Sequence, residues 1–201
     1  MNQIIHSMPG YRKSEYQLVL LPHNELRDKI ARVKREFGEK FKLRGNTGSG
    51  AHLTLVKFTQ LEMQEERLVN RLKTIAMGFQ PFKIEIKDFG SYPSHSIFLN
   101  VTSKLPIQNL VKELKTAQRL MKSASVDPHF LQEPHFIIAR KLVPWQYEQG
   151  WLEYSHRSFN ARFVADCMLL LKRREGEKRY QVAQRFEFMN LPVLVKQGEL
   201  W

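Results

Sequence analysis

Two short segments of the chain each place a histidine at the start of a β-rich run. They are HLTLVKF, which begins at His52, and HFIIARKL, which begins at His135. Alternate side chains of an extended strand share a face, so His52 and Thr54 point to the same side, about 7 Å apart along the strand. The same alternation groups His135 with Ile137. The first strand therefore offers an imidazole and a hydroxyl together, whereas the second has isoleucine in the hydroxyl position.

A pair of histidines is suited to transfer at a phosphodiester. One neutral imidazole accepts a proton from the attacking hydroxyl or water, and one imidazolium donates a proton to the leaving oxygen. Because the ordinary pKa of histidine is about 6.5, either ring can take either role near neutral pH, and the sequence leaves that choice open. A threonine hydroxyl beside the pair can donate to a non-bridging phosphate oxygen. This chemistry calls for no metal and no other cofactor.

The residue patterns predict a similar succession of elements in two halves of one domain, residues 1–201. In both halves a histidine strand follows the first helix, so the two strands would take equivalent places in pseudo-symmetric lobes and their histidines would face each other across a groove. The predicted elements of residues 16–103 are a strand from Tyr16, a helix over 26–37, the His52 strand, a helix over 68–75 and strands over 82–89 and 96–102. Those of residues 104–190 are a helix over 107–117, the His135 strand, a helix opened near Pro144 and strands over 161–173 and 178–188.

Charge points to the kind of partner. The chain has 32 Lys and Arg against 20 Asp and Glu, a net charge of +12. Such an excess favours nucleic acid or phosphorylated small molecules, although a basic surface kept for solubility is the alternative.

Composition also excludes several classes of protein. No apolar stretch approaches the roughly 20 residues of a membrane helix, and the first residues do not form a secretory signal. A single cysteine, Cys167, cannot form an internal disulfide or a thiolate metal cage. We therefore expect a cytoplasmic monomer that does not bind membranes.

HLTL from His52 and PHFIIAR from Pro134 resemble the paired H-x-S/T motifs of the 2H phosphoesterase superfamily, which includes the 2′-5′ RNA ligase and cyclic phosphodiesterase proteins. The likeness runs from about Tyr16 to about Phe188 and includes the FGSY turn after FKIEIKD. It implies an α+β fold with two lobes, antiparallel sheets lining a central cleft and helices outside. It also implies a hydrolase that opens the 2′,3′-cyclic phosphate of RNA ends or nucleotides, with 2′-5′ RNA ligation as the near reverse reaction.

The resemblance assigns His52 and His135 as the acid and base pair and Thr54 to the phosphate. Ile137 departs from the family pattern because it cannot hydrogen-bond. The alternative function is therefore a catalytically weakened RNA- or nucleotide-binding module. Lys57 and Arg140 also fit places where the family carries basic residues, but strict alternation points both away from their histidines, and they are left unassigned.

Five other features of the sequence bear on function. Tyr92 is a candidate to stack on a nucleobase of the substrate. His95, in a turn, and His129, in a loop, are interpreted as solvated. The glycine-rich segment 44–50, RGNTGSG, lacks the ending of a phosphate-binding Walker loop and is interpreted as a flap beside the cleft. The basic cluster over 172–179 is interpreted as a solvated hairpin tip.

Overall fold

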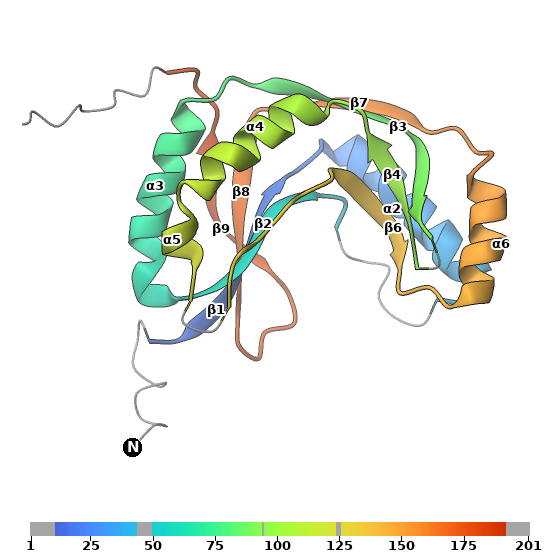
Figure 1. Ribbon diagram of the computed structural model, residues 1–201, viewed down its shortest axis with the longest axis horizontal. Coiled ribbons are helices and arrows are strands. Elements are labelled where there is room, and N and C mark those ends of the chain that lie inside the picture. Colours follow the sequence, from blue (N-terminus) through green and yellow to red (C-terminus); the bar gives the residue numbers. More distant parts are fainter. Residues whose placement is uncertain (1–10, 44–49, 94, 124–125, 192–201) are drawn as a thin grey trace, which may run out of the picture.

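The protein folds as an arch with one antiparallel sheet in each limb (Figure 1). The structure, a computed structural model, describes residues 11–43, 50–93, 95–123 and 126–191. Sheet A has the strand order β5 (His129–Phe130), β2 (Leu53–Leu61), β1 (Lys13–Leu20), β8 (Cys167–Arg174) and β9 (Gln181–Glu187). Sheet B has the order β6 (His135–Arg140), β4 (Ser96–Val101), β3 (Phe82–Tyr92) and β7 (Asn160–Ala165).

The helices pack mainly against the two sheets. Helices α2 and α6 contact sheet B, whereas α3 and α5 contact sheet A and α4 packs beside α3. Their bounds are α2 (Asn24–Lys40), α3 (Glu65–Met77), α4 (Lys104–Lys115), α5 (Gln118–Met121) and α6 (Pro144–Tyr154), with a 3₁₀ turn, η1, at Glu62–Gln64. No helix in the described parts of the chain is long and apolar enough to span a membrane. The predicted α+β class is confirmed. The predicted elements occur in the predicted order, but the single strand expected over 161–173 is wrong: it is two strands, β7 in sheet B and β8 in sheet A, because the chain passes from one sheet to the other at Asp166. The short elements α5 and β5 were not predicted.

The predicted halves do not correspond to the two limbs. Strands β1 and β2 of the first half share sheet A with β5, β8 and β9 of the second, and sheet B is mixed in the same way. A local correspondence does hold. Each histidine strand lies beside the strand that precedes its helix, because β2 pairs with β1 and β6 pairs with β4, both antiparallel.

The main core lies on one face of each sheet. The stacked rings of Tyr16 and Phe58 represent it in sheet A, and Leu99 and Phe136 represent it in sheet B; all four side chains are buried. The side chains at the intervening positions of each strand lie on the other face, which we call the histidine face because His135 belongs to it. In sheet A this face carries a small separate apolar cluster around Val19.

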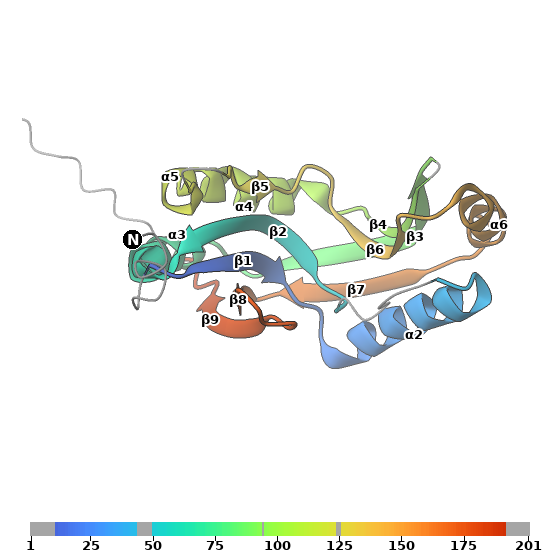
Figure 2. The same ribbon diagram turned by 90° about the horizontal axis from the view of Figure 1, so that it is seen from below.

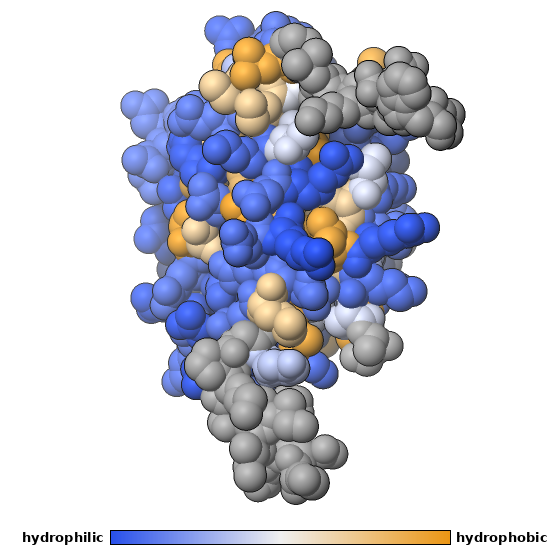
Figure 3. Space-filling model, turned by 90° about the vertical axis from the view of Figure 1, so that its left-hand side faces the viewer, coloured by the Kyte–Doolittle hydropathy of each residue, from blue (hydrophilic) through white to orange (hydrophobic). Residues whose placement is uncertain are grey.

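The outer surface of the limb that contains α3 is largely hydrophilic and has only small apolar patches (Figure 3).

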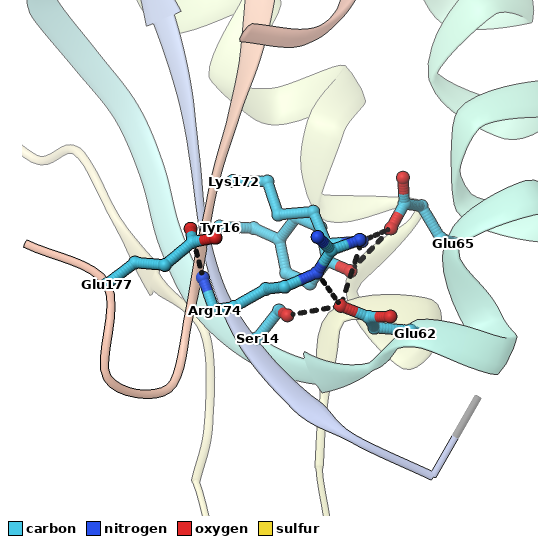
Figure 4. Close-up of polar contacts among 7 residues, drawn as sticks. All are labelled: Ser14, Tyr16, Glu62, Glu65, Lys172, Arg174 and Glu177. Atoms are coloured by element: carbon cyan, nitrogen blue, oxygen red, sulfur yellow. Dashed lines mark hydrogen bonds and ion pairs between the residues drawn. The ribbon is translucent and has the colours of Figure 1, made fainter. Parts of the chain in front are cut away.

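The basic cluster over 172–179 is not simply a solvated hairpin tip, so that interpretation is wrong for its first residues. Lys172 lies 3.1 Å from Glu62 and 2.6 Å from Glu65, and Arg174 lies 2.9 Å from Glu62 (Figure 4). Burial raises the pKa of Glu62, but hydrogen bonds from Arg174, Lys172 and Ser14 outweigh it and hold the pKa at about 2. The network joins the β8–β9 hairpin to η1 and α3. It also neutralises the charges of Lys172 and Arg174, which the sequence analysis had placed in solvent.

Candidate functional site

Each histidine strand contains a β-bulge three residues after its histidine. In β2, Leu18 pairs with Val56 and Val19 pairs with Thr54, so Leu55 is the extra residue. In β6, Ile137 pairs with Phe98 and Ala139 pairs with Ile97, so Ile138 between them is the extra residue. A bulge places two successive residues against one partner, and the alternation of side chains shifts by one position.

The two bulges bring basic residues to the histidine face. Lys57 pairs with Gln17, which shares its face of β1 with Val19, the partner of Thr54. Lys57 therefore lies on the same face as Thr54.

Arg140 is placed in the same way on β6. It pairs with Ser96, whose face of β4 also carries Asn100, the partner of His135. The expectation from strict alternation is therefore wrong: Arg140 lies on the same face as His135, and Lys57 lies on the same face as Thr54. In each strand the basic residue stands five positions after the histidine, so the two strands present similar sets of groups.

His52 is half-buried in a cationic environment immediately before β2. Its amide donates to the carbonyl of Gly50 over 2.9 Å, and a Cβ atom at Gly50 would lie 3.3 Å from the imidazole Nδ1. Burial, and then the charges of Lys34 and Arg27 on α2, lower the pKa of His52 to about 4. The ring is therefore neutral at pH 7 and available as a proton acceptor.

Lys34 connects this environment to the other sheet. Its side chain is buried, with 4% of the residue exposed, on the face of α2 that also buries Ile30 and Phe37. Burial and the charge of Arg140 lower the pKa of Lys34 to about 8. Lys34 therefore acts on His52 from α2, and Arg140 of β6 acts in turn on Lys34. The sequence analysis missed Lys34, although a lysine between two apolar residues of a helix stripe was a visible signal.

His135 stands at the start of β6 with one ring nitrogen already engaged. Its Nδ1 lies 2.7 Å from the carbonyl oxygen of Glu133. A carbonyl only accepts, so Nδ1 donates and Nε2 is the atom left to exchange a proton with a substrate. Burial lowers the pKa of His135, whereas the hydrogen bond to the Glu133 carbonyl and the Glu133 carboxylate act in the opposite direction.

An aromatic surface lies against His135. The ring of Phe98 is 4.6 Å from the imidazole and that of Tyr92 is 5.6 Å from it, edge-on. A Cβ atom at Gly90 would lie 2.6 Å from Phe98, so only glycine lets this ring lie over β3. Tyr92 is 38% exposed and can accept a stacked base, whereas Phe98, which the sequence analysis missed, is the buried support.

The two histidines approach from different sheets. Leu131, just after β5, donates its amide to the carbonyl of Leu55 over 2.8 Å. Because β5 and β2 are antiparallel, the chain after Leu131 runs toward the start of β2, where His52 lies. Strand β6 then begins at His135. Figures 1 and 2 both place the beginnings of β2 and β6 near the middle of the arch. The catalytic roles of the two rings remain predictions.

The remaining candidates lie as follows. Thr54 is half-buried, and Ile137 is 36% exposed on the histidine face beside Phe98. His95 is exposed, with Nδ1 3.0 Å from the carbonyl of Pro93.

His129, also exposed, pairs with Lys57 at the edge of sheet A. Of the predicted flap, residues 44–49 lie outside the described residues. In the part of the chain that the structure covers, no group of three or more His, Cys, Asp and Glu residues is arranged to hold a metal ion.

Two antiparallel sheets, each with a histidine strand that carries a bulge and a basic residue, define the class of protein as 2H phosphoesterase-like. The sequence profile of the 2′-5′ RNA ligase superfamily matches residues 22–177, and the chain belongs to this family. The resemblance noted in the sequence is thereby confirmed. Membership supports an enzyme with phosphoesterase-type function.

The solved structures of several proteins share the fold. The crystal structure of E. coli LigT complexed with 3′-AMP has a TM-score of 0.59 and 16% sequence identity, covering 88% of this chain and 98% of that one. A crystal structure described only as that of a phosphoesterase has a TM-score of 0.62 and 16% identity, covering 87% and 98%. The protein TT0787 of Thermus thermophilus has a TM-score of 0.60 and 15% identity, again covering 87% and 98%. No curated protein sequence matches the chain.

Proposed function

We propose that the protein is a metal-independent phosphoesterase that opens the 2′,3′-cyclic phosphate of an RNA end or nucleotide. The observation that carries this proposal is the equivalence of the two histidine strands, each with a bulge three residues on and a basic residue five residues on. The relative LigT has been crystallised with 3′-AMP, which is the product expected when the bond to the 2′ oxygen of adenosine 2′,3′-cyclic phosphate is hydrolysed.

We assign distinct roles to the two histidines. His52, with its pKa lowered to about 4, is neutral at pH 7 and accepts a proton from the attacking water. The water oxygen forms a bond to phosphorus while the bond from phosphorus to the 2′ or 3′ oxygen breaks. His135 enters this step as an imidazolium, with its Nδ1 proton bonded to the Glu133 carbonyl, and donates its second proton from Nε2 to the leaving oxygen. The product is a phosphomonoester with a free neighbouring hydroxyl.

The charge that develops on the phosphate is stabilised by groups of the histidine face. The Thr54 hydroxyl donates on the side of His52. Ile137 offers no donor on the other side, where we assign this role to Arg140, which the bulge turns to the same face. A guanidinium can donate two hydrogen bonds to phosphate oxygens. In ligation, the 5′ hydroxyl of a second RNA attacks the cyclic phosphate in place of water. The bond from phosphorus to the 3′ oxygen breaks, and the product is a 2′-5′ phosphodiester.

The test is turnover of 2′,3′-cyclic nucleotides and of oligoribonucleotides with cyclic ends, in a chelator. We expect His52→Ala and His135→Ala each to lose activity by at least 10²-fold. His156→Ala is the matched control, since His156 is exposed at the end of α6. Unchanged turnover in both site variants would refute the proposal.

The second candidate function is the binding module, favoured by Ile137. It predicts salt-sensitive binding of RNA by the wild-type protein without turnover of any cyclic phosphate.

A further inference from the structure

A groove leads away from His135 along α4. Its volume is about 190 Å³, and it is formed between α4 and the connection from β5 to β6. Its lining includes Pro134, the residue directly before His135. Figures 1 and 2 show this connection running beside α4 toward the middle of the arch, where β6 begins. A chain whose end occupies the candidate site can therefore continue into this groove.

The wall that α4 contributes is cationic. Lys112 and Lys115 line the groove and are exposed, and within the described residues neither has an ion-pair partner. By contrast, Lys104 is paired with Glu133 at 2.7 Å. A separation of three residues places the two lysines on one side of the helix, with their backbones about 4.5 Å apart along its axis. The groove therefore offers two adjacent positive charges that form no ion pair with any carboxylate of the described residues.

The rest of the lining suits a polynucleotide. Gln108, one turn before Lys112, and Gln132, on the opposite wall, present amides that both donate and accept. Such groups can bond to the 2′-hydroxyls and base edges of a single strand. Ile107 and Val111 are buried and make the floor apolar. A small anion alone would not use such a mixed surface.

We propose that this groove binds the RNA strand adjoining the reacting end, with Lys112 and Lys115 on its phosphates, so that the substrate is an oligoribonucleotide rather than a free nucleotide. This inference rests on the proposed function, because that function places the reacting end at His135. It does not depend on which histidine is the acid.

The experiment compares two substrates in three proteins. The proteins are the wild type, the double variant Lys112→Gln with Lys115→Gln, and a control double variant, Lys73→Gln with Lys178→Gln, which removes the same charge from exposed lysines outside the groove. The substrates are adenosine 2′,3′-cyclic phosphate and a short single-stranded oligoribonucleotide with a 2′,3′-cyclic end. Turnover gives kcat and KM, and fluorescence anisotropy gives the Kd of the oligonucleotide across a series of salt concentrations.

We expect the groove variant to raise the KM and Kd of the oligonucleotide roughly tenfold and to leave the mononucleotide unchanged. The slope of log K against log salt should become shallower by about 1.4, which is about 0.7 for each lost phosphate contact. The control should match the wild type.

Equal effects of the groove variant on both substrates, or no effect on either, would overturn the proposal. Wild type without turnover of any substrate would end the proposed function. The anisotropy would still decide about the groove, since RNA binding that is absent or independent of the two lysines refutes it.

Discussion

The substitution Lys34→Met removes the buried cation that faces His52 and should change the titration of that ring. The pKa of Lys34 is about 8, so its side chain is charged throughout the range in which a histidine titrates. The pKa of His52 is lowered from 6.5 to about 4, a difference worth about 3 kcal/mol between the two protonation states. Burial is the largest cause, and Lys34 is the next. Methionine preserves the apolar stem without the charge, so we expect the pKa of His52 to rise to between 4 and 6.5.

Two measurements test this prediction. NMR titration of the imidazole resonances gives the pKa directly, and the acidic limb of the kcat/KM profile should move to higher pH in the same direction. His135 is the internal control, since Lys34 does not contribute to its lowered pKa. A His52 ring that titrates at the same pH with and without Lys34, while His135 also stays constant, would refute the electrostatic link between α2 and the site.

The same shift makes the fold sensitive to acid. A histidine whose pKa is lower in the folded state than in the unfolded state destabilises the fold only at a pH low enough for the unfolded chain to bind a proton that the folded chain does not bind. His52 therefore has no effect on stability above about pH 6.5 and costs up to about 3 kcal/mol as the pH falls through 4. The free energy of unfolding, measured by urea denaturation over this range, should fall less steeply in Lys34→Met than in wild type.

Three further substitutions test other parts of the structure. Gly90→Ala should lower the free energy of unfolding by about 1 to 3 kcal/mol, because the new methyl group meets the Asn100 side chain and, at 2.6 Å, the Phe98 ring; a melting temperature equal to wild type would contradict this packing. Ile137→Thr places a hydroxyl on the histidine face and should raise kcat/KM for a cyclic nucleotide by up to about 10²-fold, whereas an unchanged value would mean that Arg140 already meets the need for a donor. Glu62→Gln should cost roughly 1 to 3 kcal/mol at pH 7, and the loss should shrink as the pH falls from 4.5 toward 2, where wild-type Glu62 becomes protonated; denaturation at pH 7 and pH 3 would show whether the two losses differ.

The amino-acid sequence by itself determined most elements of this fold and the strands that carry the candidate chemistry, although it did not divide residues 161–173 between the two sheets. Leu26, Ile30 and Phe37 recur at the spacing of a helix face, and all three are buried in α2. The strand beginnings at His52 and His135 were predicted to within one residue. Such patterns are readable because the periods of helices and strands are local properties of the backbone.

Only the tertiary structure decided which groups accompany each histidine. The bulges at Leu55 and Ile138 exist because β1 and β4 pair with them in a shifted register, and this pairing turned Lys57 and Arg140 to the histidine face. Strand β1 belongs to sheet A, but the helix that follows it, α2, packs on sheet B, and this packing brings Lys34 near His52. Alternation is fixed along one chain segment, whereas a bulge or a buried charge depends on a partner distant in sequence.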